Sequence, residues 1–122
     1  MAQAMTKAGE KSFLYHFTYV DPGKRSPLGA HHGEELFFLS DSFPADWEHT
    51  NEDTHLGELL RGYWVEFAKT GDPNFGGAPQ LPAFDSNSGD YLEIGAHVGL
   101  RPVSERIRVL ETIMRRIVAE QN

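Results

Sequence analysis

The alternation of apolar and polar residues predicts two strands. Residues 12–20 (SFLYHFTYV) place an aromatic side chain at every odd position, and Leu14 and Val20 add apolar groups to the opposite face. A period of two is typical of a strand. Because both faces are largely apolar, the pattern favours a strand covered on both sides, as in the interior of an α/β sheet. Residues 91–94 (YLEI) follow a turn and predict a second, short strand.

A longer segment repeats its apolar residues at the spacing of a helix. From Leu56 onward they fall at i, i+3, i+4, i+7, i+8 and i+11, which is one helical face. We expect a helix over about residues 53–70, with Asn51 or Asp53 as N-cap and a glycine and a proline as stop signals. The large aromatic residues of this face, Trp64 among them, are expected in the core.

A second helix is expected over about residues 103–120. Its apolar residues alternate spacings of four and three, which is typical of a coiled-coil seam. They are Val103, Ile107, Leu110, Met114 and Ile117. Only about two heptads are present, fewer than the three or four that indicate a coiled coil. The helix can therefore pack on its own domain or form a dimer seam, and both alternatives stay open.

Together these elements predict an α+β fold in a single domain, residues 1–122. We expect a small two-stranded sheet packed with the helices at about 53–70 and 103–120. A length of 122 residues suits one domain.

Composition and charge narrow the possible functions. The chain contains no cysteine, which excludes disulfides, iron–sulfur clusters and a cysteine nucleophile. Without an apolar stretch long enough for a bilayer or a signal peptide, we expect a soluble, cytoplasmic protein with no membrane partner. Residues 34–93 hold thirteen acidic and two basic groups, so we expect no nucleic-acid partner. The arginines of residues 94–122 form a solvated helix face or pair with acidic surface, on this chain or on a second copy.

One short segment gathers the groups that could perform proton transfer or bind a metal. They are His31, His32, Glu34 and Glu35. Adjacent histidines point in different directions, and no third ligand follows at a spacing typical of metal sites, so we expect no metal and no cofactor. A histidine on a glycine-flanked loop can act as a general base, and it can equally be a solvated surface group.

The same segment resembles a known family. Residues 26–36 (SPLGAHHGEEL) are similar to the segment around the active-site histidine of the type B carboxylesterases, the para-nitrobenzyl esterase and cholinesterase group. Residues 63–74 resemble the helix and stop of that family, and residues 81–85 followed by 91–94 resemble its proline-aromatic loop and closing strand. The matches come in the family's order and imply the C-terminal end of an α/β-hydrolase fold.

The resemblance assigns roles to two residues of the loop. The family's H-G-x-E pattern falls on His32, Gly33 and Glu35. His32 would be the general base of a Ser-His-acid triad, and Glu35 a supporting carboxylate. The triad acid of the family lies upstream of the segment that this chain resembles, and His31 falls at a variable position.

The other parts of an esterase site are missing from the 122 residues. None of the serines has a glycine two positions away on both sides, so there is no G-x-S-x-G elbow. No glycine-rich oxyanion segment is present either. Since Met1 falls inside what the family would make a helix, we expect either a gene that carries a detached piece or an expressed fragment.

Three hypotheses follow. The first is a non-catalytic, self-associating carboxylesterase-like domain, a homodimer formed through the C-terminal helix, the edge of strand 12–20, or both, because an unpartnered apolar strand edge invites pairing. The second is one half of a split ester hydrolase that supplies His32 to an N-terminal esterase half. The third is an independent small enzyme that uses the histidine loop for other acid–base chemistry.

Overall fold

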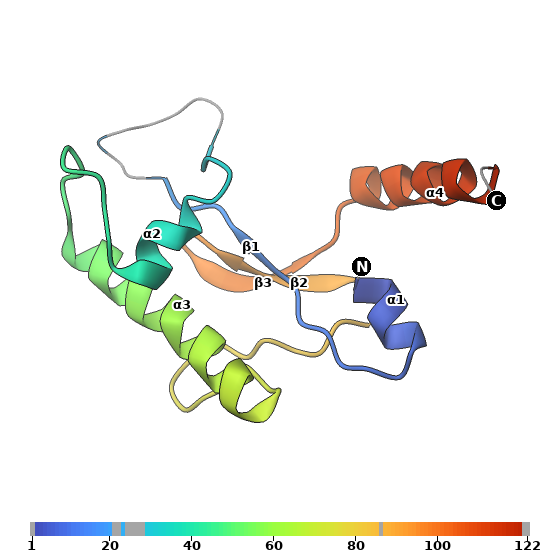
Figure 1. The fold of residues 1–122 in the computed structure, drawn as a ribbon, viewed down its shortest axis with the longest axis horizontal. Helices are drawn as coiled ribbons and strands as arrows, with labels where there is room; N and C mark the ends of the chain where they lie inside the picture. Colours follow the sequence, from blue (N-terminus) through green and yellow to red (C-terminus); the bar gives the residue numbers. More distant parts are fainter. Residues whose placement is uncertain (1, 21–22, 24–28, 86, 121–122) are drawn as a thin grey trace.

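The fold combines a small sheet with four helices in the part of the chain that the structure, a computed structural model, describes: residues 2–20, 23, 29–85 and 87–120 (Figure 1). The start of the predicted histidine segment, residues 26–28, lies outside these residues. The elements are α1 (Ala2–Lys7), β1 (Tyr15–Phe17), α2 (Glu35–Ser40), α3 (Asn51–Thr70), β2 (Asp90–Ile94), β3 (Val98–Pro102) and α4 (Glu105–Glu120).

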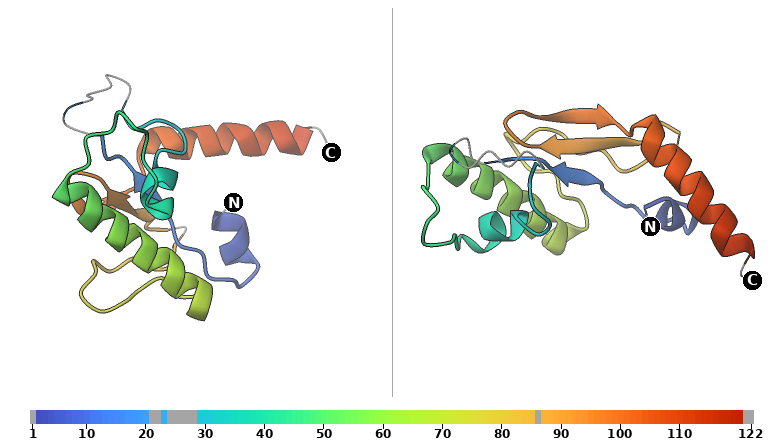
Figure 2. Two further views of the ribbon diagram at one scale, coloured as in Figure 1. Left: turned by 60° about the vertical axis from the view of Figure 1, so that its left-hand side comes forward. Right: turned by 90° about the horizontal axis from the view of Figure 1, so that it is seen from above.

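The two predicted strands are neighbours and run parallel. In the register of β1 and β2, Tyr15 lies opposite Leu92 and Phe17 opposite Ile94. Pairing extends beyond the ends of β1, because the Thr18 N–H donates to the Ile94 carbonyl at 2.8 Å. A parallel pair needs a long crossover, and here the crossover contains α2 and α3, which lie on the same side of the sheet (Figure 2).

The sheet has three strands in the described residues, one more than expected. The third, β3, pairs antiparallel with β2 as a hairpin, with Glu93 opposite Gly99 and Asp90 opposite Pro102. The sequence pattern does not predict β3, because Gly99 and Pro102 are unfavourable strand residues. Pro102 is tolerated there because β3 is an edge strand.

The first long helix is present, but its N-terminus differs from the prediction. The N-cap of α3 is Thr50, neither Asn51 nor Asp53. The Thr50 hydroxyl accepts from the Asp53 N–H at 3.1 Å, and the Asp53 carboxylate accepts from the Thr50 N–H at 2.8 Å, which forms a capping box. At the other end Gly71 adopts φ 79°, so the predicted glycine stop is confirmed.

The core lies between the sheet and the α2–α3 pair. Four of its side chains have no exposed surface: Phe38, Leu60, Leu92 and Ile94. Phe38 of α2 is surrounded by aromatic rings at centroid distances of 5.1 to 6.0 Å. The expectation that the large aromatic residues of the α3 face lie in this core is wrong for two of them, since Trp64 is 50% and Phe67 49% exposed.

The C-terminal helix does not cover the sheet. Instead, α4 extends from the end of β3 away from α2 and α3 (Figures 1 and 2). Its beginning is tied to the turn before β2 by two hydrogen bonds, from the Val103 N–H to the Gly89 carbonyl at 2.9 Å and from Arg108 Nη2 to the Ser88 carbonyl at 3.0 Å. The expected packing of this helix on its own sheet is therefore wrong for the described side chains of α4. Over the same described residues, no helix is both long and apolar enough to cross a bilayer.

Candidate active-site histidine loop

The loop of the two histidines connects the end of β1 to α2. One glycine lies on each side of the histidines, and both adopt left-handed backbone conformations: Gly29 has φ 80° and Gly33 has φ 79°. Such angles favour glycine because other residues meet steric conflict there. The glycine after His32 is thus required by the turn that leads directly into α2.

A buried carboxylate closes this turn. The Glu34 N–H donates to the His31 carbonyl at 3.1 Å, and the His31 N–H donates back to Glu34 Oε2 at 2.6 Å. Glu34 is only 7% exposed, whereas the His31 side chain is 74% exposed and its Nδ1 lies 3.5 Å from the same carboxylate oxygen. Glu34 therefore fixes the backbone immediately before His32.

Sequence reasoning placed Glu34 in the acidic cluster but missed this role. A glutamate three residues after the start of a turn, just before a helix, can reach back to a backbone N–H as in a capping box. That spacing was the available signal. It distinguishes Glu34, which serves the backbone, from Glu35, which the family pattern singles out.

His32 is exposed at the rim of an open depression of about 490 Å³. The depression is lined by Tyr15, His16, Phe17, Ala30, His31, His32, Gly33 and Glu35. His32 and Glu35 thus share one surface, but the His32 imidazole has no hydrogen bond to any described residue. No described carboxylate is hydrogen-bonded to the His32 imidazole.

Glu35 is the first residue of α2 and is half-buried. The charge of Glu35 affects the pKa of Tyr15 of β1, and Tyr15 lines the same depression. Burial raises the pKa of the Tyr15 phenol, and the negative charge of Glu35 raises it further. Glu35 therefore contributes negative potential to the depression.

The loop does not form a metal centre or an enclosed pocket in the described ranges. No group of three histidine, aspartate or glutamate side chains comes close enough there to hold a metal ion. Of the two glutamates, Glu34 is turned to the backbone of His31 and Glu35 faces an open surface. The convergent carboxylates that the third hypothesis requires are therefore not assembled.

Comparisons with known proteins identify the family and the fold of the chain. Residues 1–109 match the model of the carboxylesterase family. Carboxylesterase 1D of Rattus norvegicus is 38% identical over 94 residues, which are 73% of this chain and 16% of that protein. An esterase from Clostridium hathewayi superposes with a TM-score of 0.72 at 20% identity, covering 83% of this chain and 20% of that one. Carboxylesterase EST55 of Geobacillus stearothermophilus gives a TM-score of 0.68 at 24% identity, covering 84% and 22%.

A parallel strand pair with a crossover on one side and a histidine loop after the first strand defines a piece of an α/β-hydrolase esterase fold. Because the family model matches most of the residues, the chain belongs to the carboxylesterase family. The predicted resemblance is confirmed. The chain spans about a sixth of the length of the rat enzyme and about a fifth of the solved esterases.

Proposed function

We propose that this 122-residue polypeptide is a non-catalytic, self-associating carboxylesterase-like domain. The observation that carries the proposal is the amount of apolar surface without a partner. Trp64 and Phe67 on α3, and Ile107, Leu110, Ile113 and Ile117 on α4, are each 43% to 61% exposed. Large exposed apolar side chains on two helices rarely stay uncovered on a monomer, and they mark interaction sites.

The absence of turnover follows from what His32 lacks. A histidine acts as general base only when a nucleophile lies within hydrogen-bond reach, and in a triad a carboxylate orients it. The sequence holds no G-x-S-x-G elbow, and none of the described carboxylates bonds to His32. The isolated chain therefore has no triad serine from which His32 could accept a proton.

Two measurements on the purified chain test the proposal. Light scattering should give twice the chain mass of 13.7 kDa. Hydrolysis of para-nitrophenyl acetate should be the same for the wild type and for His32→Ala. A monomer across the accessible concentration range would contradict self-association, and turnover that disappears in His32→Ala would contradict the non-catalytic role.

A second candidate function is one half of a split ester hydrolase, in which His32 is supplied to a partner chain. The observation in its favour is the free edge of β1. The Leu14 carbonyl and the Thr18 N–H point to β2, so the backbone groups of Tyr15 and Phe17 point to the opposite edge, where no described backbone group bonds to them. A strand added there would lie next to the depression that contains His32.

Reconstitution tests this alternative. The chain would be mixed with a polypeptide that carries a G-x-S-x-G elbow and an oxyanion segment of the family. Hydrolysis that appears only in the mixture, and is lost with His32→Ala, would support the split enzyme. If the mixture shows no binding and no activity, the split enzyme is excluded for that partner.

A further inference from the structure

Two unpartnered apolar surfaces belong to different parts of the molecule. The first, here called the α3 groove, is an open cleft of about 200 Å³ lined by Phe13, Tyr15, Tyr63, Trp64, Phe67, Pro73 and Leu81. The second, here called the α4 stripe, consists of Ile107, Leu110, Ile113 and Ile117. The side chain of Met114, which the sequence places on the same stripe, is outside the described part of the structure.

We propose that α4 of each copy docks in the α3 groove of a second copy, so that two chains exchange their C-terminal helices. This inference rests on the proposed self-association and specifies its geometry. The occupant of the groove is the α4 stripe of the second chain, and the exchange is reciprocal. A reciprocal contact closes as a dimer, whereas a one-way contact would continue as a filament.

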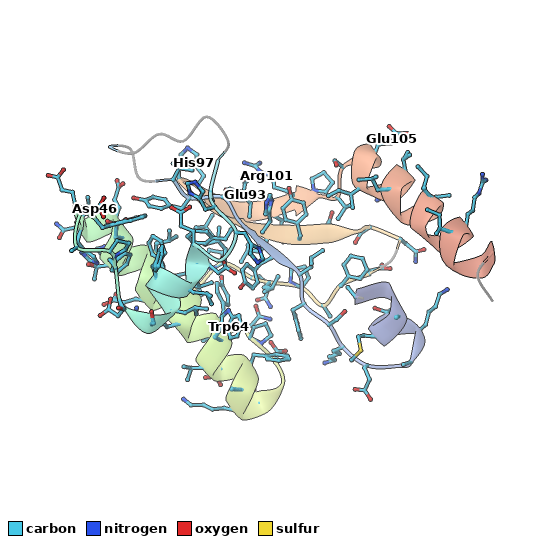
Figure 3. The ribbon with its side chains drawn as sticks, turned by 45° about the horizontal axis from the view of Figure 1, so that its top comes forward. Asp46, Trp64, Glu93, His97, Arg101 and Glu105 are labelled. Atoms are coloured by element: carbon cyan, nitrogen blue, oxygen red, sulfur yellow. The ribbon has the colours of Figure 1, made fainter. Side chains whose placement is uncertain are left out.

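The position of α4 makes the helix available for a second chain. Hydrogen bonds to the turn before β2 hold Val103 and Arg108, the latter in the first turn of the helix. After Arg108, every described side chain of α4 is exposed. A helix of 16 residues is about 24 Å long. In Figure 3, Trp64 on α3 and Glu105 at the beginning of α4 lie well apart, so the helix of one chain leaves its own groove uncovered.

The charges of the two parts are complementary. Residues 34–93, which include α3, carry thirteen acidic and two basic groups, whereas residues 94–122 carry five basic and three acidic groups. Glu66 and Asp72 precede the groove residues Phe67 and Pro73. A seam between two α4 helices would bring arginine-rich segments together. Docking on the acidic α3 of a second copy instead places opposite charges side by side.

The area also favours exchange over a simple helical seam. An aromatic side chain buries about 150–250 Å² in total, and Trp64 and Phe67 are each about half exposed. Covering both rings therefore removes about 150–250 Å² per groove. The four residues of the α4 stripe add a similar area, and both contributions count twice. The sum is about 600–1,000 Å², which reaches the lower limit for a specific interface, whereas a seam of two α4 stripes alone would bury about half of that area and two heptads are short for a coiled coil.

Mixing two defective variants tests the exchange. The stripe variant is Leu110→Asp with Ile117→Asp, and the groove variant is Trp64→Asp with Phe67→Asp. Each alone should be monomeric, because neither homodimer retains an intact helix–groove contact. An equimolar mixture should recover dimers, because the helix of the groove variant fits the groove of the stripe variant. Their dissociation constant should lie about tenfold or more above the wild-type value, since one of the two contacts is lost.

The matched control uses an exposed apolar residue outside both surfaces. Val65→Asp on α3 replaces a side chain that is 50% exposed. This variant should stay dimeric. A groove variant that remains a dimer would indicate an α4–α4 seam, and a stripe variant that remains a dimer would indicate pairing of strand edges; either result would overturn the exchange while leaving self-association intact. A monomeric wild type would overturn both proposals.

Cross-linking keeps the proposal testable if the groove variant fails to fold. The chain has no cysteine, so single-cysteine variants report one contact each. Phe67→Cys mixed with Ile113→Cys should form a mixed disulfide under mild oxidation. Val65→Cys mixed with Ile113→Cys is the control and should not exceed random collision. Predominant Ile113→Cys homodimers in the first mixture would contradict the exchange.

Discussion

The capping carboxylate Asp53 offers the sharpest test of what holds α3 in place. Its side chain is 1% exposed. Asp53 Oδ2 accepts from the Thr50 N–H at 2.8 Å and from Trp47 Nε1 at 3.3 Å, and so joins the helix to the loop before it. Asp53 Oδ1 and the Tyr19 hydroxyl are both buried, and neither forms a hydrogen bond within the described part of the chain. Replacing Asp53 with alanine therefore removes two hydrogen bonds, and one of them is the bond to the Thr50 N–H.

The expected cost follows from these contacts. Loss of a cap costs about 1 kcal/mol, and a buried donor left unsatisfied costs about 1–3 kcal/mol. Since Thr50 and Trp47 are only half-buried, the lower end of that range applies. Asp53→Ala should lower the free energy of unfolding by about 2–3 kcal/mol, which is about 8–12 °C in Tm for a domain of this size. Asp53→Asn keeps the volume and one acceptor and should lose about half as much.

Thermal unfolding followed by circular dichroism measures the effect, at one fixed protein concentration because self-association makes Tm depend on it. The control is Glu52→Ala, which changes an exposed acidic residue in the same helical turn. It should cost no more than the 0.3–1 kcal/mol or so of a helix-dipole interaction. Equal losses for Asp53→Ala and Glu52→Ala would refute the reasoning.

The same residue makes stability depend on pH. Burial alone would raise the pKa of Asp53, but hydrogen bonds donated by the Thr50 N–H and by the Trp47 indole outweigh it, so the pKa lies below its ordinary value of 3.8. Between the two pKa values the unfolded chain binds more protons than the folded one, so stability rises with pH there. The advantage of the wild type over Asp53→Asn should be fully present above pH 3.8 and shrink as the pH falls below it.

Two further substitutions probe close contacts away from the capping box. A Cβ at Gly62 would collide with the ring of Phe75, so Gly62→Ala should cost about 1–3 kcal/mol in thermal unfolding. Gly76→Ala, where a Cβ meets open space, should be neutral within error, and equal losses at the two sites would contradict the clash. On the sheet, Arg101 Nε donates to Glu93 at 2.7 Å and lowers the pKa of that carboxyl (Figure 3). In Arg101→Ala the NMR-titrated pKa of Glu93 should move up, and an unchanged value would show that the ion pair does not form in solution.

Sequence periodicity was sufficient where one element determines its own boundaries. The helix α3 has an uninterrupted apolar face and a glycine that stops it, and both are local signals. The predicted N-cap was wrong by one to three residues, because Thr50, Asn51 and Asp53 are all good caps. Only the reciprocal hydrogen bonds of the capping box select Thr50. The strand β3 was missed because its stability comes from pairing with β2 rather than from its own residues.

Exposure could not be predicted because it depends on which partner is present. The apolar face of α3 continues through Trp64 and Phe67 without any change in pattern. The rest of this chain, however, covers only the first part of that face. Likewise, the pattern identified His32 and Glu35 but could not show that no described acid reaches the imidazole. Patterning reveals which surface is apolar or reactive. It does not reveal what covers that surface.

The two proposed associations use adjoining surfaces and therefore interfere with each other. Tyr15 lines the α3 groove, and its backbone forms part of the free edge of β1. A partner strand added to that edge would place its own side chains beside the groove, where α4 of a second copy docks in the exchanged dimer. Partner binding would then require dissociation of the dimer, so the apparent affinity for a partner falls by the fraction of free chain. The stripe variant, which cannot exchange its helix, should consequently bind an esterase N-terminal half more tightly than the wild type does. Equal affinities would show that the two surfaces act independently.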